Sequence, residues 1–161
     1  MSRMPFVNSW IARDGRMVLI CDTVISTFKV HQQTLGMSES GGGVLLGRRR
    51  GIHLAVVHAT GPMRTDQRSP MFFIRNSAGH QEQAVTLWEQ SGGEIGYVGE
   101  WHTHAEKIPR PSSIDTNQWR ELAEREPVNA PKLAVIVGMR QLYVALLKYG
   151  RAIESLEAEL S

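Results

Sequence analysis

The stretch Ile95-Gly-Tyr-Val-Gly-Glu-Trp-His-Thr-His104 decides how this sequence is interpreted. Its apolar composition between the glycines of Ser91-Gly-Gly93 and a proline-bearing loop predicts a buried β-strand. Because residues i and i+2 of a strand point to the same side, His102 and His104 present two imidazoles to one point. A pair of imidazoles in this arrangement is a candidate metal site.

The segment that follows supplies a third candidate ligand. A helix is expected from Ser112 to about Glu126, and Ser112 and Asp115 then share one face of its first turn. If this turn folds back beside the strand end, two nitrogens and one carboxylate converge. Three protein ligands with an open fourth position are typical of catalytic zinc, so we expect one Zn²⁺ per chain, bound by His102, His104 and Asp115.

Hydrolysis at such a site also needs a proton carrier and an oxyanion donor. Zinc lowers the pKa of bound water from about 15.7 to about 7, and a nearby carboxylate then moves the proton. Glu39, beside the glycines of Gly41–Gly43, is the candidate base, and the Ser112 hydroxyl is the candidate donor. Asp22 and Glu100 are the alternative bases, and Glu100 is also a candidate to orient a ligand imidazole.

The ordinary explanation of these residues is a polar strand followed by a helix cap. With six histidines, His-x-His is expected by chance about 0.2 times per sequence. Serine and aspartate at fixed offsets lower this expectation to about one in a thousand. The complete spacing therefore favours the metal site.

The remaining pattern predicts an α/β fold, a mixed β-sheet flanked by helices. The last two expected strands form a hairpin, which excludes a purely parallel sheet. Residues 61–76 are expected to be a long irregular loop, and Asp22 is expected to cap the first helix. Strands are expected at 16–21, 44–47, 52–58, 95–104, 133–137 and 142–147, and helical spacing is found at 22–33, 79–90, 112–126 and 151–160.

Composition indicates one globular domain, spanning residues 1–161. The net charge of +2 and the pI of about 8.9 are too weakly basic to indicate nucleic-acid binding. The single cysteine, Cys21, excludes an internal disulfide and is expected to be an inert buried thiol. No apolar run is long enough for a membrane span or a secretory signal, so we expect a cytoplasmic protein.

Several other residues are expected to be structural. Trp101 is expected in the core, and Arg48-Arg-Arg50 is expected to be a solvated turn rather than a docking patch. The other four histidines, which lack a partner at metal-ligand spacing, receive no role in the site: His31, His53, His58 and His80.

Glu39 and the pattern His102-x-His104-x7-Ser112-x2-Asp115 resemble the JAMM (MPN+) zinc metalloproteases. The resemblance spans nearly the whole chain and implies a fold of the cytidine-deaminase-like class. It also implies zinc binding by the histidines and the aspartate, general acid–base catalysis by Glu39 and stabilisation of the tetrahedral intermediate by Ser112.

The Gly-Glu-Trp-His-Thr-His segment more narrowly resembles bacterial deconjugases of anti-phage islands. These accompany activating and conjugating enzymes, which attach the C-terminus of a nucleotidyltransferase or ubiquitin-like protein to lysines. The implied activity is hydrolysis of that amide bond, and the implied partners are the C-terminal tail, its conjugates and the enzymes of the same operon.

The chain departs from the family pattern at two positions. Ala105 stands where many members have proline, and Glu39 lies eight residues before Gly47, one more than in many relatives. Two other functions remain alternatives: a metal-free scaffold of the same fold, and a DNA-associated RadC-type domain. RadC-like sequences usually carry Asn between the histidines and Pro-Ser-Gly after them, and this chain has neither.

Overall fold

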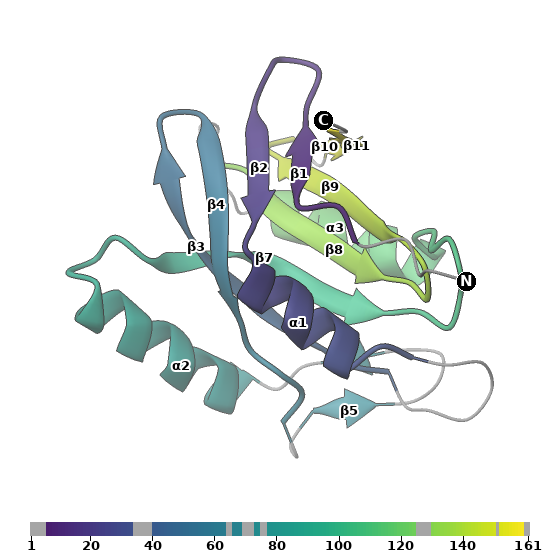
Figure 1. Ribbon diagram of the computed structural model, residues 1–161, viewed down its shortest axis with the longest axis horizontal. Helices are drawn as coiled ribbons and strands as arrows, with labels where there is room; N and C mark the ends of the chain where they lie inside the picture. Colours follow the sequence, from purple (N-terminus) through teal and green to yellow (C-terminus); the bar gives the residue numbers. More distant parts are fainter. Residues whose placement is uncertain are drawn as a thin grey trace.

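The structure is a computed structural model with three helices and eleven strands among its described residues (Figure 1). It describes residues 6–33, 40–63, 66–68, 73–74, 77–124, 130–150 and 152–159. The helices are α1 (Asp22–Val30), α2 (Ser77–Gln90) and α3 (Ser113–Glu124). The strands are β1 (Ser9–Ile11), β2 (Met17–Ile20), β3 (Gly42–Arg50), β4 (His53–Ala59), β5 (Gln67–Arg68), β6 (Phe73–Ile74), β7 (Gly96–Thr103), β8 (Lys132–Val137), β9 (Leu142–Lys148), β10 (Ala152–Ser155) and β11 (Glu157–Ala158).

Nine strands form one mixed sheet, in the order β10-β9-β8-β7-β3-β4-β2-β1-β11. The pairs β7–β8 and β2–β4 are parallel, and the other pairs are antiparallel. Helix α1 packs on β4, and α3 packs on β9 and β10. Figure 1 shows α1 in front of the sheet and α3 behind it. The predicted mixed sheet flanked by helices is therefore confirmed.

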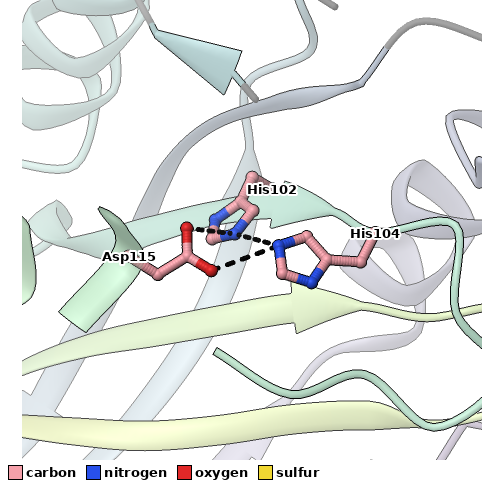
Figure 2. A group of neighbouring side chains, drawn as sticks. All are labelled: His102, His104 and Asp115. Atoms are coloured by element: carbon pink, nitrogen blue, oxygen red, sulfur yellow. Dashed lines mark hydrogen bonds and ion pairs between the residues drawn. The ribbon is translucent and has the colours of Figure 1, made fainter. Parts of the chain in front are cut away.

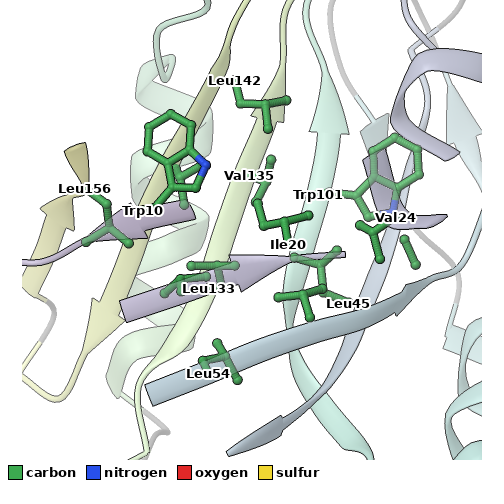
Figure 3. Packing of buried hydrophobic residues seen from close by; sticks show 14 of the residues in the cluster. Trp10, Ile20, Val24, Leu45, Leu54, Trp101, Leu133, Val135, Leu142 and Leu156 are labelled. Atoms are coloured by element: carbon green, nitrogen blue, oxygen red, sulfur yellow. The ribbon is translucent and has the colours of Figure 1, made fainter. Parts of the chain in front are cut away.

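Each face of the sheet has its own hydrophobic core. The larger cluster joins α1 to one face and includes Phe28, Leu45 and Trp101, all at most 1% exposed (Figure 3). The smaller cluster joins α3 to the other face and includes Trp119 and Ile136. Burial of apolar side chains on both faces fixes which residues of β7 point to α1 and which point to α3.

Strand β7 is clamped between β3 and β8. A Cβ atom added at Gly99 would lie 2.0 Å from the backbone oxygen of Leu133, so only glycine fits at this point of the β7–β8 pair. Trp101, predicted to be a core residue, is 1% exposed, and its Nε1 donates to the Thr60 carbonyl at 2.9 Å. The strand that carries the two histidines is therefore held in a fixed register.

The helix expected at 151–160 is wrong. Residues 152–155 pair with β9, residues 157–158 pair with β1, and only Leu156 separates the two strands. Leu156 is 7% exposed, and its N–H donates to the Val144 carbonyl at 2.8 Å. The tail thus forms both edge strands of the nine-stranded sheet, and its pairing with β9 and β1 outweighs the helical spacing of the apolar residues.

Four further expectations are corrected. Arg48 to Arg50 lie in β3, and the turn falls at Gly51, whose φ of +59° favours glycine. Cys21, expected to be buried, is half-buried. It is also the N-cap residue of α1, so Asp22 begins the helix instead of capping it. The segment expected to be wholly irregular contains the short pair β5–β6. Strand β1 is an element that the sequence pattern did not indicate.

A buried polar network fastens the start of α2 to β3. The Thr60 hydroxyl accepts from the Val44 N–H at 2.9 Å and lies 2.5 Å from Nδ1 of His80. Nε2 of His80 lies 2.9 Å from Oδ2 of Asp66. Because Asp66 accepts, Nε2 carries the proton and Nδ1 accepts from Thr60. His80 is 1% exposed, so its role here is structural.

Among the described residues, no helix is long and apolar enough to cross a membrane.

Candidate metal centre

Three predicted ligand residues come from adjacent elements. His102 lies near the end of β7, and His104 follows that strand, with its N–H donating to the Val137 carbonyl of β8 at 3.1 Å. Asp115 lies in the first turn of α3, whose start folds back over the strand end. Figure 2 shows the three side chains pointing toward one another. Among the described residues, these three form a group that could hold a metal ion, because their ligand atoms all lie within 4.8 Å of one another.

The donor atoms are spaced as ligands of one ion. Nε2 of His102 lies 3.2 Å from Nε2 of His104 and 3.2 Å from Oδ1 of Asp115. Nε2 of His104 lies 3.2 Å from Oδ2 of Asp115. A tetrahedral zinc with bonds of about 2.0–2.1 Å places its ligand atoms about 3.3 Å apart. Two imidazole nitrogens and a carboxylate are also ligand types that zinc accepts. The residues present therefore fit a divalent metal with a vacant ligand position.

The electrostatics of the group favour a charged carboxylate. Burial by itself raises the pKa of Asp115, but hydrogen bonds with His102 and His104 outweigh it and hold this pKa well below its usual range. Burial lowers the pKa of His104, but Asp115 and Glu106 raise it above the usual value. Hydrogen bonds among these side chains hold the donor atoms together.

The start of α3 is also a reciprocal cap. The Ser112 N–H donates to Oδ2 of Asp115 at 2.8 Å, and the Asp115 N–H donates to the Ser112 hydroxyl at 3.1 Å. The ordinary explanation, a capping arrangement, is thus present together with the cluster. Because the Ser112 oxygen accepts this bond, the hydroxyl proton is available for donation to another oxygen.

Most of the chain is similar in sequence to known proteins. The family described as prokaryotic homologs of the JAB domain, Prok-JAB, matches residues 24–147. The chain belongs to the Prok-JAB family. This JAB domain is 39% identical to a CD-NTase/cGAS isopeptidase of Pseudomonas aeruginosa, over 89% of the chain and 92% of the relative. It is 36% identical to a protein of the same name from Escherichia coli, over 89% of the chain and 88% of the relative.

A relative from Vibrio cholerae, also named CD-NTase/cGAS isopeptidase, is 36% identical over 65% of the chain and 67% of its own length. The fold is similar to the solution structure of a protein from Desulfitobacterium hafniense, with a TM-score of 0.62 and 22% identity over 90% of this chain and 93% of that one. The resemblance to JAMM isopeptidases of anti-phage systems is therefore confirmed. Membership of the family and the relatives' names support a hydrolase with an isopeptidase role.

Glu39 lies outside the described residues of the JAB domain. The chain is described again from Ser40, and the Gly41 N–H donates to the Thr103 hydroxyl at 2.8 Å. Gly42 is then paired with His102 across β3 and β7. The residues that directly follow Glu39 are therefore anchored beside the histidine strand.

The two alternative bases do not join the cluster. The Asp22 carboxylate accepts from Nδ2 of Asn8 at 3.0 Å, at the start of α1. The Glu100 carboxylate accepts from the Tyr97 hydroxyl at 3.1 Å, toward the other end of β7. Neither belongs to the metal-binding group found among the described residues. A role for Glu100 in orienting a ligand imidazole stays a prediction.

Two neighbours of the histidines were not predicted. Oε1 of Glu106 lies 2.9 Å from Nδ1 of His104, on the opposite side of the ring from Nε2. The ring of Trp119, which is 3% exposed, lies 6.3 Å from that of His102 and stacks on Tyr143. A carboxylate two residues after a ligand histidine is a local signal that was available in the sequence. The contact with Trp119 depends on how α3 packs on the sheet, so the sequence carried no local signal of it.

Proposed function

We propose that this JAB domain is a zinc-dependent isopeptidase. Its substrate is the amide bond that follows the C-terminus of a conjugated CD-NTase or ubiquitin-like protein. The main support for this proposal is the set of three 3.2 Å separations among the donor atoms of His102, His104 and Asp115. Three relatives named CD-NTase/cGAS isopeptidase support the choice of a CD-NTase as the conjugated protein.

The proposed ligands are Nε2 of both histidines and the Asp115 carboxylate. A zinc ion bound there supplies Lewis acidity, which makes water a nucleophile near neutral pH. The cap at the start of α3 orients the carboxylate, since the Ser112 N–H holds Oδ2. Trp119 buries one side of His102 and limits its rotation.

The proton steps are assigned to Glu39. Its carboxylate takes the proton from the attacking water and delivers it to the lysine amine that leaves. The Ser112 hydroxyl donates to the oxyanion that forms when water adds to the carbonyl. Gly41 and Gly42, which closely follow Glu39 in the sequence, are anchored beside Thr103 and His102, and this supports the assignment of the proton steps to Glu39.

Exposed apolar side chains beside the cluster support binding of an extended tail. Ile108 is 60% exposed in the segment after His104, and Ile114 is 57% exposed next to Asp115. Their exposure suits contact with apolar residues of a flexible C-terminus. The proposed setting is the cytoplasm, where the activating and conjugating enzymes of the same operon make the conjugates.

A fusion protein tests the proposed function. A CD-NTase carries a fluorescent protein joined by a peptide bond to its C-terminal residue, and a second fusion carries a ubiquitin-like protein in place of the CD-NTase. We expect about one zinc per chain, cleavage directly after the C-terminal residue, and loss of cleavage with a zinc chelator. Glu39→Gln is expected to retain zinc and lose cleavage.

Two outcomes would contradict this proposal. Cleavage that persists both with chelator and in Glu39→Gln would mean that another mechanism or a contaminant acts. A folded protein that binds no zinc when purified without chelator would instead be a scaffold of the same fold. A Glu39→Gln variant with full activity would remove only Glu39 from the mechanism.

A further inference from the structure

A second concave site lies at the opposite end of β7 from the histidines. A cavity of about 570 Å³ lies between the ends of β3 and β7 and the C-terminal turn of α2, and Arg48, Trp88 and Glu94 line it. Figure 1 shows α2 near the start of β7. Gly96, in the cavity wall, precedes His102 by six positions. At about 3.3 Å per residue, the two sites are about 20 Å apart along the strand.

The run Arg48-Arg-Arg50 divides its side chains between two tasks. Arg49 also borders the cavity, but side chains alternate along β3, so it points away from its two neighbours, and its Nη2 donates to the Pro131 carbonyl at 2.8 Å. Arg48 lines the cavity, and its Nε is buried without a hydrogen-bond partner among the described residues. The Arg49 guanidinium is therefore held by a backbone carbonyl, whereas Arg48, whose Nε is buried, has its terminal nitrogens left for a ligand.

The charge of Arg48 is only weakly compensated. Its Nη1 lies 3.8 Å from Oε2 of Glu94, a side chain that is 70% exposed. An ion pair at this distance and exposure contributes little, because water and salt screen it. Arg50 adds a second guanidinium to the cavity wall and is exposed. The cavity therefore favours an anionic group.

Trp88 places an apolar surface beside these guanidinium groups. Trp88 lies in the last turn of α2 and is 55% exposed, so much of its apolar surface faces solvent. A Cβ added at Gly93 or Gly96 would lie 3.5 Å or 3.8 Å from indole atoms, so both glycines give the ring a flat support. Gly93 has φ of +86°, which also favours glycine.

We propose that this cavity, defined by Arg48, Trp88 and Glu94, docks an acidic segment on the folded body of the conjugated protein. A carboxylate of that segment pairs with Arg48, and an adjacent apolar side chain packs on Trp88. Tryptophan and arginine are the residue types that most often dominate binding energy at protein interfaces. The inference rests on the proposed function, since the tail of the same protein lies at the metal.

The separation of the two sites suits a folded substrate. A domain of 100 residues has a radius of gyration of about 13 Å, so it spans more than the 20 Å or so between the sites. The body of a conjugated protein can therefore contact this cavity while its tail reaches the histidines. A short tail peptide can reach the metal alone.

The test compares two substrates in Trp88→Ala and Arg48→Ala. The first is the CD-NTase fusion described above, and the second is a peptide of the last ten CD-NTase residues with a C-terminal fluorophore. We expect KM for the fusion to rise about 30-fold in Trp88→Ala and about tenfold in Arg48→Ala, with kcat unchanged. Cleavage of the peptide is expected to stay at the wild-type rate, which also shows that the variants fold.

Matched controls separate docking from general surface changes. Val85→Ala removes another exposed apolar side chain of α2, and Arg13→Ala removes an exposed arginine in the turn between β1 and β2. Both are expected to keep the wild-type KM. Arg48→Lys, which keeps the charge but loses the guanidinium fork, is expected to lose most of the affinity that Arg48→Ala loses.

The outcomes distinguish this inference from the proposed function. Wild-type KM for the fusion in both cavity variants would overturn the docking site and leave the isopeptidase proposal standing. Equal loss with the fusion and the peptide would also overturn it, because the cavity would then affect the metal end. If the wild-type protein cleaves neither substrate, the proposed function fails and the docking site fails with it.

Discussion

The contact between Glu106 and His104 makes a quantitative prediction about metal affinity. Because a carboxylate only accepts, the 2.9 Å contact assigns the proton of the neutral imidazole to Nδ1 and leaves Nε2 as the lone-pair donor. Partners of this kind typically contribute a factor of about 10–100 to metal affinity. Glu106 is 50% exposed, so solvent screens its charge and the lower end applies.

We therefore expect Glu106→Ala to weaken zinc binding about tenfold, which is about 1.4 kcal/mol. Glu106→Gln is expected to lose less, because an amide oxygen still accepts from Nδ1 without the charge. The dissociation constant is measured by competition with a chromogenic chelator, independently of catalysis. Cobalt-substituted protein gives a second readout, since a reoriented imidazole changes the visible absorption bands of Co²⁺.

Glu121→Gln is the matched control, because Glu121 is exposed on α3 and removal of its charge leaves the His104 contact intact. It is expected to bind zinc as the wild-type protein does. If Glu106→Ala and Glu121→Gln give equal dissociation constants, the carboxylate does not orient His104 and the reasoning is refuted. A loss in both variants would show a general effect of net charge.

Three further predictions concern packing, burial and protonation. Gly99→Ala is expected to lower the free energy of unfolding, measured by urea denaturation, by about 3 kcal/mol. The reason is that its Cβ would lie 2.0 Å from the Leu133 oxygen. His80→Leu is expected to cost about 3 kcal/mol in the same measurement, since it leaves the buried groups of Thr60 and Asp66 without this partner. The pKa of His104 is raised above its usual 6.5, so protons compete with the metal for this nitrogen at a higher pH than usual. As the pH is lowered, metal affinity should therefore begin to fall while the pH is still above 6.5. The metal-free protein should respond oppositely, with this contribution to stability complete below pH 6.5 and lost as the pH rises through the raised pKa.

The parts of the site that rest on short-range geometry could be predicted from the sequence. The alternation of a strand places His102 and His104 on one side, and the three-residue spacing of a helix start joins Ser112 to Asp115. Both rules need only neighbouring residues, so no knowledge of distant contacts is required. The same applies to Glu106, two residues beyond His104.

Features that depend on distant pairing could not be predicted in this way. Residues 152–158 have apolar spacing of a helix, but they lie between two open sheet edges that come from β9 and β1. Nothing local in the sequence indicates that these edges approach each other. The hydrogen bond of Arg49 with the Pro131 carbonyl likewise depends on the length of β3, which extends beyond the predicted strand.

The helix cap and the metal cluster at Asp115 are one arrangement rather than two competing ones. A cap needs the Asp115 carboxylate turned back to the Ser112 N–H, and this same rotation directs Oδ1 to His102 and Oδ2 to His104. Holding a charged carboxylate in a site that is only 11% exposed would otherwise be costly, because burial disfavours its charge. The cap N–H offsets part of that cost and fixes the side chain before a metal arrives. An aspartate at this position therefore prepares the site through ordinary helix chemistry, so the commonness of capping does not count against the metal site.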